Sequence, residues 1–312
     1  MNTTAIVMTE PRTMELRDMQ LTPAVEDEAR VNVLWSGIST GTEKLLWEGT
    51  MPEFPGMGYP LVPGYEAVGR IEAAPDASRF APGDLVFVPG ANCFAGARGL
   101  FGANARAVSV PAERLIPLPE KVGRNGVLLA LAATAYHAIM LNDKTLPDLI
   151  IGHGVLGRLL ARLTAAMDGE APTVWENNAA RAQAADYEIL SEATDKRRDY
   201  KSIIDASGDP RILNTAVSRL ARNGEVTLAG FYAEPLSLTF PPAFMKQARF
   251  RIAAEFEPSD IYAVLDLMSD GHLSLDGLIT HVAPVGDVAG SYEQAFSDPE
   301  VLKMIFEWES YS

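Results

Sequence analysis

Cysteine is almost absent from this chain, because Cys93 is the only one among 312 residues. A single thiol cannot form a disulfide within the chain, and it cannot supply a zinc site made of several cysteines. We therefore expect neither a disulfide framework nor a four-cysteine zinc lobe.

Long apolar runs are missing as well. The longest nearly apolar run, residues 126–141, contains Tyr136 and His137 and is shorter than the roughly 18–20 residues of a membrane-spanning helix. The N-terminal segment has no basic stretch followed by an apolar one, which a signal peptide would show. These patterns predict a cytoplasmic protein with no transmembrane segment.

Positive charge is scarce too. The chain has 26 lysines and arginines against 41 aspartates and glutamates, which gives a formal net charge of −15 at pH 7. A nucleic-acid surface needs clustered cations, and the cluster at residues 196–198 is more typical of a solvated turn. We expect no nucleic-acid partner.

Glycine, in contrast, is placed as a dinucleotide-binding loop requires. An apolar strand-like run, residues 149–151, leads into Gly152, Gly154 and Gly157, and a helix-compatible run, residues 158–167, follows. In such a loop the first glycine permits the tight turn and the second lets the backbone approach the pyrophosphate. The third lets the helix pack against the strand, and the helix N-terminus presents free N–H groups to the phosphates.

An acid ends the next strand candidate. Glu176 lies close to the roughly 20-residue offset at which a carboxylate accepts hydrogen bonds from the adenosine ribose. Because this carboxylate repels a 2′-phosphate and Asn177 follows it, we favour NAD as the cofactor. Arg181 is near enough in the sequence to keep NADP as the alternative.

The chain divides into three parts by its local patterns. Residues 1–122 contain short strand candidates separated by Pro- and Gly-rich turns, which is typical of a β-barrel. Residues 123–257 alternate strands and helices and predict a doubly wound parallel sheet, so the fold class is α/β. Residues 258–312 are expected to return to the first domain. The strand candidates are 30–35, 67–71, 85–88, 105–110, 149–151, 173–175, 187–190, 202–205, 225–229, 250–254 and 278–282, and the helix candidates include 126–141, 259–269 and 288–296.

Several segments in a shared order make the chain similar to the medium-chain dehydrogenase/reductase family. The resemblance implies a GroES-like β-barrel catalytic domain joined to a Rossmann doubly wound parallel sheet. It also implies an NAD-dependent alcohol dehydrogenase that acts on a CH–OH group. The matching segments are residues 37–43, 63–69, 81–86, 133–138, 152–157, 204–208, 224–230 and 278–281.

Within the family, the resemblance is strongest to members that oxidise the 3-(1-hydroxyethyl) group of a bacteriochlorophyllide to acetyl in bacteriochlorophyll a biosynthesis. It therefore implies a tetrapyrrole substrate. Aromatic and methionine side chains can cover a flat macrocycle, although the same residues are also typical of ordinary core and loop packing. The candidates for substrate binding are Trp47, Phe54, Met57, Tyr59, Phe94 and Phe101.

The family resemblance also bears on metal binding. Zinc-dependent members use a cysteine, a histidine in a Gly-His-Glu motif and a further cysteine or acid, and the metal acidifies the alcohol. Here Ser39 or Thr40 stands at the cysteine position and Tyr65 at the histidine position, which leaves Glu66 as one carboxylate without a neighbouring Cys or His. We expect no metal, and therefore a zinc-independent enzyme.

Without a metal, protein groups must hold the alcohol oxygen. The candidates for catalysis are Tyr65, Ser39, Thr40, Thr42 and Glu66. Tyr65 is a poor base near neutral pH unless a cation such as Lys44 lowers its pKa, and it is alternatively a half-buried tyrosine at a strand start. Glu66 is either a base or a hydrogen-bond anchor.

The resemblance implies further contacts with the cofactor and with a second copy of the chain. Thr134 corresponds to a position facing the nicotinamide, and the backbone N–H of His153 is expected to touch the pyrophosphate. Residues 234–241 look like the family's subunit-pairing strand and imply a homodimer. The remaining cofactor candidates follow strands or belong to the glycine loop, and they are Val155, Leu156, Ser207, Gly208, Gly230 and Phe231.

Two other functions fit the same patterns. One is a zinc-free quinone, enone or aldehyde reductase of the same family, and the other is a non-catalytic dinucleotide-binding protein. The aromatic loops and the preference for NAD that Glu176 suggests favour the alcohol dehydrogenase.

Overall fold

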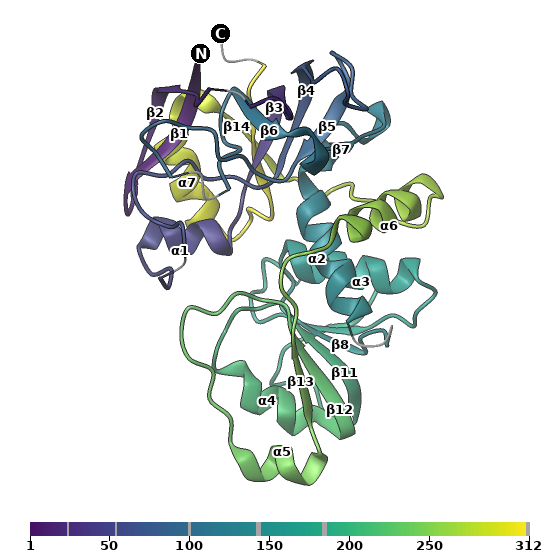
Figure 1. Ribbon diagram of the computed structural model, residues 1–312. Helices are drawn as coiled ribbons and strands as arrows, with labels where there is room; N and C mark the ends of the chain where they lie inside the picture. The colour runs from purple at the N-terminus through teal and green to yellow at the C-terminus, as the bar shows by residue number, and fades with distance from the viewer. Residues whose placement is uncertain (24, 54, 99–100, 142–144, 183–185, 310–312) are drawn as a thin grey trace. The chain divides into compact units, whose positions relative to one another are not determined.

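The computed structural model describes residues 1–312 except 24, 54, 99–100, 142–144, 183–185 and 310–312 (Figure 1). The described residues form two compact units, Met1–Leu129 with Asp276–Ser312, and Ala130–Leu275.

The first unit is dominated by β-structure. Its seven-stranded sheet has the order β14-β15-β3-β4-β5-β7, β6 also pairs with β3, and β1 and β2 form a separate antiparallel hairpin. All pairs in the larger sheet are antiparallel except β14 with β15. The strands are β1 (Asn2–Glu10), β2 (Thr13–Gln20), β3 (Glu28–Ile38), β4 (Ala67–Ala73), β5 (Leu85–Val88), β6 (Ala107–Pro111), β7 (Ile116–Pro117), β14 (His281–Pro284) and β15 (Met304–Glu307).

Short helices complete this unit and the polypeptide returns to it at Asp276. β15 pairs with β3, so the C-terminal tail is part of the same sheet as residues near the N-terminus. The helices are α1 (Thr42–Glu48), η1 (Ala112–Arg114), η2 (Glu120–Leu128), η3 (Val285–Asp287) and α7 (Val288–Ser297). This closure places residues of the tail beside the loops that follow β3 and precede β4.

The second unit contains the parallel sheet that the strand–helix alternation predicts. Its strand order is β10-β9-β8-β11-β12-β13, and every pair is parallel. The chain winds outward in one direction from β8 and in the other from β11, so the order reverses between these two strands. The strands are β8 (Leu149–Ile151), β9 (Thr173–Trp175), β10 (Ile189–Leu190), β11 (Tyr200–Asp205), β12 (Leu220–Leu228) and β13 (Arg249–Ile252).

Helices cover both faces of the parallel sheet. In Figure 1, α4 and α5 lie on one side of the sheet and α3 lies on the other. The helices of this unit are α2 (Leu129–Met140), α3 (Val155–Ala166), α4 (Ile212–Arg219), α5 (Phe240–Lys246) and α6 (Pro258–Ser269). Among the described residues, no helix is long and apolar enough to cross a membrane.

The units divide at 129/130 and 275/276, whereas the sequence suggests divisions at 122/123 and 257/258. Side-chain contacts explain why α6 belongs with the parallel sheet. His137 Nδ1 on α2 lies 2.9 Å from Asp260 Oδ2 on α6, and the Arg162 guanidinium donates to the Ser274 carbonyl at 2.8 Å. The tail therefore rejoins the first unit only after Leu275.

Several expected elements differ in extent. The expected helix at residues 126–141 begins with 3₁₀ turns in η2, and its α-helical part starts only at Leu129. The expected strand at 187–190 is reduced to β10, and the one at 278–282 is shifted to β14. Residues 234–239 form no strand within the chain, because Asn214 holds this segment through hydrogen bonds to Ser237 and Thr239.

Candidate active site

The glycine loop lies at the switch point of the parallel sheet, immediately after β8. Gly152 has a φ of 96°, a left-handed conformation that favours glycine. A Cβ at Gly157 would overlap the carbonyl oxygen of Gly152, so only glycine allows α3 to pack this close to the loop. Both positions have the roles that the sequence pattern predicts.

Gly154 differs from the other two glycines. Its φ of −74° is open to any residue, and a Cβ there would meet no protein atom within 4 Å. It is the N-cap of α3 and has no side-chain cap, so the first N–H groups of this 12-residue helix lack a partner from its side chain. Neither the backbone conformation nor the packing of the protein therefore requires glycine at this position.

Glu176 follows β9 directly and contacts the glycine loop. Its Oε1 accepts a hydrogen bond from the Asn178 backbone N–H at 2.7 Å, and its Oε2 accepts one from the His153 N–H at 3.2 Å. The His153 N–H is therefore directed to Glu176, which differs from the expected contact with the pyrophosphate. Asn177 is exposed beside this carboxylate.

The His153 side chain is fully buried and holds the glycine loop in place through its ring nitrogens. Its Nδ1 lies 2.6 Å from the Arg181 carbonyl oxygen, so Nδ1 must carry the proton, and Nε2 accepts from the Tyr187 hydroxyl at 2.7 Å. Burial lowers the pKa of the imidazole. The Arg158 guanidinium donates to the same Arg181 carbonyl oxygen and also to the carbonyl oxygen of His153. His153 is thus a structural anchor of the loop.

The neighbouring strand ends complete this edge of the sheet. Asp205 ends β11, is fully buried, and accepts hydrogen bonds from the Ser207 N–H at 2.9 Å and the Tyr232 hydroxyl. A Cβ at Gly230 would lie 2.7 Å from the Gly208 nitrogen, so the loops after β11 and β12 are in close contact. The other expected cofactor residues are Val155, which is buried; Leu156 and Thr134, which are half-buried; and Phe231, which is 46% exposed.

A hydroxyl pair lies in the first unit, between the end of β3 and the start of β4. The Ser39 Oγ and the Tyr65 hydroxyl are 2.7 Å apart, and the Thr42 side chain also hydrogen-bonds to Tyr65. Ser39 is buried, whereas Tyr65, Thr40 and Thr42 are half-buried. The structure therefore brings together Tyr65, Ser39 and Thr42.

The environment of Tyr65 keeps its hydroxyl protonated near neutral pH, so the phenolate that could act as a base is not populated. Burial raises the pKa of its phenol, and the neighbouring carboxylates of Glu66 and Glu43 raise it further. Lys44 does not lower this pKa, because its ammonium group donates to the Phe296 carbonyl oxygen at 3.3 Å. Tyr65 is suited to donate a hydrogen bond near neutral pH.

Glu66 is engaged by a cation from the tail of the chain. The Lys303 ammonium forms an ion pair with Glu66 Oε2 and donates to the Ile38 carbonyl at 3.0 Å, and both side chains are almost completely buried. This arrangement agrees with the anchoring role for Glu66 rather than the role of base.

A second buried carboxylate lies on α1. Glu43 is fully buried and accepts a hydrogen bond from the Tyr292 hydroxyl at 3.0 Å. Tyr292 in turn accepts from the Asn104 amide at 2.9 Å. Burial, followed by the charge of Glu66, raises the pKa of Glu43 to about 8.

Comparison with known proteins now identifies the scaffold. Residues 25–120 match the alcohol dehydrogenase GroES-like domain family. The 2-desacetyl-2-hydroxyethyl bacteriochlorophyllide A dehydrogenase of Cereibacter sphaeroides is 54% identical, with 99% of each chain covered. The chain belongs to the medium-chain dehydrogenase/reductase family.

A second relative agrees with this assignment, and a solved structure agrees with the fold. The protein of the same name from Rhodobacter capsulatus is 53% identical, again with 99% of each chain covered. A solved short chain alcohol dehydrogenase from Escherichia coli CFT073, complexed with NADH, has a TM-score of 0.84 at 21% identity and covers 98% of this chain and 99% of its own. The α/β fold class, with a GroES-like domain and a Rossmann-type parallel sheet, is confirmed.

The side chains present do not fit the zinc site of zinc-dependent members of the family. Ser39 and Tyr65 offer neutral hydroxyls that hydrogen-bond to each other, and Glu66 is paired with Lys303. Among the residues that the structure describes, no three His, Cys, Asp or Glu side chains are grouped to hold a metal ion. Because zinc prefers thiolate, imidazole and carboxylate donors, these hydroxyls are poor replacements.

The apolar residues expected to bind substrate have different environments in this dehydrogenase. Phe94 is 5% exposed and lies in the hydrophobic core, so it is a packing residue rather than a contact surface. Trp47 is half-buried against Phe296, with ring centroids 5.4 Å apart, and the Phe101 ring lies 4.9 Å from that of Tyr65. Met57 and Tyr59 are partly buried at the edge of the core, and Phe54 lies outside the described residues.

Glu43, Glu66, Asn104, Tyr292 and Lys303 form a buried polar cluster in the first unit. The sequence patterns identified Glu66 as a candidate but not the other four. One signal was available, because Lys303 interrupts the otherwise apolar segment that leads into β15. A lysine is rarely buried without a partner, so the position of Lys303 predicts a buried carboxylate close to it.

Proposed function

We propose that this enzyme oxidises the 3-(1-hydroxyethyl) group of a bacteriochlorophyllide to an acetyl group, with NAD as the hydride acceptor and without zinc. The observation that carries the proposal is the full-length identity of 54% to a bacteriochlorophyllide dehydrogenase. The chain is accordingly an oxidoreductase of bacteriochlorophyll biosynthesis that acts on a CH–OH group.

The choice of NAD rests on Glu176. Its carboxylate lies after β9, next to the glycine loop, where it can accept hydrogen bonds from the ribose hydroxyls of the cofactor. A 2′-phosphate in the same place would be repelled by this negative charge. When bound, the nicotinamide accepts the hydride, and the protein must orient the alcohol and remove its proton.

The hydroxyl pair of Ser39 and Tyr65 is suited to hold the substrate oxygen. Each hydroxyl can both donate and accept a hydrogen bond, and the raised pKa keeps Tyr65 protonated. Glu66, held by Lys303, maintains a fixed negative charge beside Tyr65. We assign Tyr65 and Ser39 to the alcohol oxygen, with Thr42 supporting Tyr65.

The flat faces of the macrocycle require apolar contacts. Phe101 lies directly against Tyr65, which connects it to the proposed reaction centre. Trp47, Met57 and Tyr59 are the other partly exposed candidates in the first unit, and burial of Phe94 removes it from the set. Aromatic rings and methionine are well suited to such a ligand because they offer large, polarizable surfaces.

A turnover assay tests the function directly. Purified protein is mixed with 3-(1-hydroxyethyl) bacteriochlorophyllide a and either NAD or NADP, and both the pigment spectrum and formation of the reduced nicotinamide are followed. We expect turnover with NAD and formation of the acetyl product. Turnover of small enones with NADPH in place of this reaction would favour the reductase alternative, and NAD binding without any turnover would favour the non-catalytic one.

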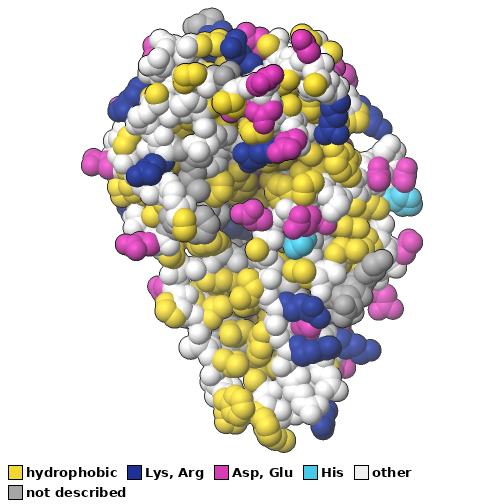
Figure 2. All heavy atoms as spheres, viewed as in Figure 1, with side chains coloured by type: hydrophobic (Ala, Val, Ile, Leu, Met, Phe, Trp, Pro, Cys, Tyr) yellow, Lys and Arg dark blue, Asp and Glu magenta, His cyan; other side chains and the backbone are white. Residues whose placement is uncertain are grey.

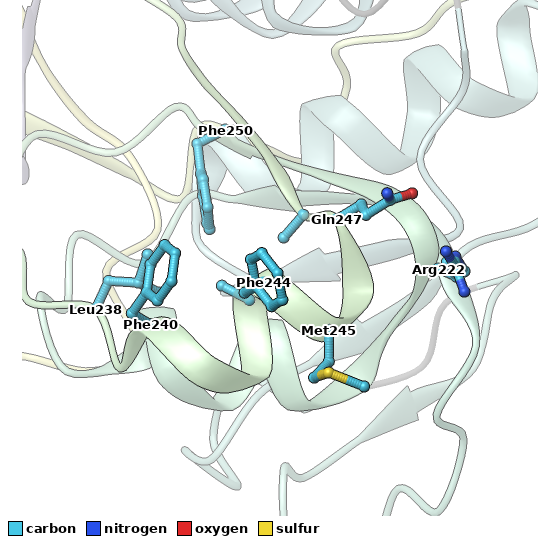
Figure 3. A pocket seen from close by; sticks show the side chains of 9 residues that line it. Arg222, Leu238, Phe240, Phe244, Met245, Gln247 and Phe250 are labelled. Atoms are coloured by element: carbon cyan, nitrogen blue, oxygen red, sulfur yellow. The ribbon is translucent and has the colours of Figure 1, made fainter.

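We further propose that the enzyme is a homodimer that pairs through the outer edge of the parallel sheet. β13 is the edge strand, and its Ile252 is 77% exposed. Apolar side chains gather over α5 in Figure 2, and Figure 3 shows Leu238, Phe240 and Phe244 around a pocket next to β13. In a monomer these apolar side chains and the unpaired edge of β13 are exposed to water, which is unfavourable. A second copy of the chain would bury the side chains and pair with the strand edge.

A further inference from the structure

An arginine without a carboxylate partner lies in the first unit. Arg98 is exposed, and none of the carboxylates that the structure describes forms an ion pair with it. Other arginines of this unit are paired, since Arg30 Nη1 lies 3.4 Å from Glu72 Oε1 and Arg70 Nη1 lies 2.8 Å from Glu120 Oε1. Carboxylates are plentiful in a chain with a formal net charge of −15. The guanidinium of Arg98 is therefore available to an anion that comes from outside the chain.

Backbone hydrogen bonds fix Arg98 beside the segment that leads to Tyr65. The Arg98 N–H donates to the Pro60 carbonyl oxygen at 2.8 Å, and the Val62 N–H donates to the Arg98 carbonyl oxygen at 3.0 Å. Arg98 also forms a parallel bridge with Leu61. Leu61 precedes Tyr65 by four residues, and a chain of this length spans at most about 14 Å. The guanidinium and the proposed reaction centre therefore belong to neighbouring parts of the same unit.

Apolar side chains lie next to both of these groups. The side chain of Arg98 lies against Gly58, because a Cβ at Gly58 would be 3.6 Å from Arg98 Nε and 3.9 Å from Arg98 Cγ. Met57 and Tyr59 flank this glycine, are partly buried, and are candidates for contact with the macrocycle. Phe101 contacts the tyrosine of the hydroxyl pair. The first unit thus combines a cation, a hydroxyl pair and apolar surface within a short stretch of two paired segments.

A bacteriochlorophyllide has the same three features. Its 1-hydroxyethyl group lies on one pyrrole ring, its free propionate lies on another, and the flat macrocycle connects them. In a bacteriochlorophyll this propionate is esterified and carries no charge. A protein of net charge −15 repels a carboxylate at long range, so the propionate needs a local cation to bind. The planar guanidinium group suits this task because it can form two parallel hydrogen bonds to one carboxylate.

A second arginine beside the apolar candidates is already engaged. Arg12 has its guanidinium carbon 4.9 Å from the ring centroid of Trp47, which is a cation–π contact. Within the described part of the chain, Arg98 has no such contact with an aromatic ring. Arg98 is therefore the arginine that is free to bind a carboxylate.

We propose that Arg98 binds the free propionate of the bacteriochlorophyllide and makes the enzyme select the acid over its ester. The proposal rests on the function proposed above and names the group that holds the far end of the substrate. A carboxylate held by Arg98 limits rotation of the macrocycle, so the alcohol is presented to Tyr65 and Ser39. Arg98 is a specificity-determining residue and touches none of the reacting atoms.

Kinetics with the free acid and with its propionate methyl ester test this assignment. Both forms of 3-(1-hydroxyethyl) bacteriochlorophyllide a are assayed with NAD in the same detergent. We expect wild type to have a KM about tenfold lower for the acid than for the ester, with similar kcat. Arg98→Gln should lose this difference because its KM for the acid rises. Arg106→Gln, at an exposed arginine of the same unit that pairs with no described carboxylate, is the matched control and should behave like wild type.

A lysine variant and added salt separate a carboxylate contact from an effect on packing. Arg98→Lys keeps the charge but loses the second parallel hydrogen bond, so it should restore part of the preference for the acid. Higher ionic strength should raise the wild-type KM for the acid and leave that for the ester unchanged. Equal KM values for acid and ester in wild type, or an unchanged preference in folded Arg98→Gln, overturn the proposal.

Binding without turnover keeps this inference distinct from the proposed function. The acid and the ester are each titrated into wild type and Arg98→Gln without NAD, and the pigment spectrum is followed. Absence of turnover, together with a binding preference for the acid that Arg98→Gln removes, overturns the assigned reaction and supports the carboxylate contact. Turnover of both forms without a preference for the acid overturns the contact and leaves the function intact. Failure of wild type to bind either form overturns both.

Discussion

The hydroxyl of Tyr65 lies 2.7 Å from the Oγ of Ser39. The pair joins the loop after β3 to the loop that precedes β4. Because burial and nearby carboxylates raise the pKa of Tyr65, this pair can orient an alcohol but cannot by itself remove the proton.

Tyr65→Phe should lower kcat for bacteriochlorophyllide oxidation by about 100-fold, since the contribution of a positioned proton donor or acceptor is typically of this size. Binding of NADH, measured by fluorescence, should be unchanged, because Tyr65 belongs to the first unit and the glycine loop to the second. Tyr262→Phe, at a 38% exposed tyrosine, is the control. An unchanged rate in Tyr65→Phe would remove this hydroxyl from the reaction.

Alanine substitutions at two glycines of the loop should separate stability from cofactor binding. Gly154→Ala should melt like wild type, because the new methyl group meets no protein atom, but should bind NAD at least about tenfold more weakly. Gly157→Ala should be destabilised by about 2 kcal/mol or more, because the methyl group overlaps the Gly152 carbonyl. Calorimetry of melting and of NAD binding checks both. Wild-type NAD affinity in Gly154→Ala would refute the role assigned to this position.

Glu176→Ala should weaken NAD binding by about tenfold, because hydrogen bonds to a charged group contribute about 1.5–3 kcal/mol. It should also reduce the ratio of NAD affinity to NADP affinity, because the carboxylate that repels the 2′-phosphate is gone. The measurement is the dissociation constant of each cofactor by titration calorimetry. Glu188→Ala, at an exposed glutamate just before β10, is the control. Equal losses for both cofactors would mean that Glu176 only supports the loop through His153 and Asn178.

Lys303→Met should destabilise the fold by about 3–5 kcal/mol, because it leaves the buried Glu66 carboxylate without its cation. The free energy of unfolding is measured in urea. Adding Glu66→Gln to Lys303→Met should recover part of the lost free energy of unfolding, because it removes the unpaired buried carboxylate. Lys44→Met, which removes a partly exposed pair with Glu48 and a hydrogen bond to the Phe296 carbonyl, should cost clearly less, about 1 kcal/mol. A mild effect of Lys303→Met would contradict a buried ion pair at this site.

Ile252→Lys should convert the proposed homodimer to a monomer of 33.7 kDa, because it places a charge on the edge strand β13. Light scattering coupled to gel filtration gives the mass directly. Val282→Lys, at a 45% exposed valine on β14, is the matched control and should not change the mass. A monomeric wild type at micromolar concentration would exclude this assembly.

Local patterns predicted the glycine loop between β8 and α3 well. The run from β8 through Gly152 and Gly157 into α3 depends on backbone conformations of consecutive residues, and these follow from residue type. Element bounds were less accurate where neighbours decide them. The expected strand at 187–190 shortened because only Ile189 and Leu190 pair with β9.

Such local patterns could not predict the buried polar cluster of the first unit. Tyr65 and Glu66 were recognised from their motif, but Glu66 was not assigned a partner, and Lys44 was considered as the nearby cation. The actual cation, Lys303, is 237 residues from Glu66 in sequence, and Tyr292 is 249 residues from Glu43. The pairing of β15 with β3 places Lys303 beside Glu66, and α7 carries Tyr292 to Glu43 on α1.

The sequence by itself determined the α/β class, the glycine loop and the acid after β9, because each depends on short-range geometry and hydrogen bonding. Only the tertiary structure decided which carboxylate is paired with a cation and which is left to hold a proton. That distinction depends on burial and on the charges within a few ångströms, and both arise only when the C-terminal strand closes the first sheet.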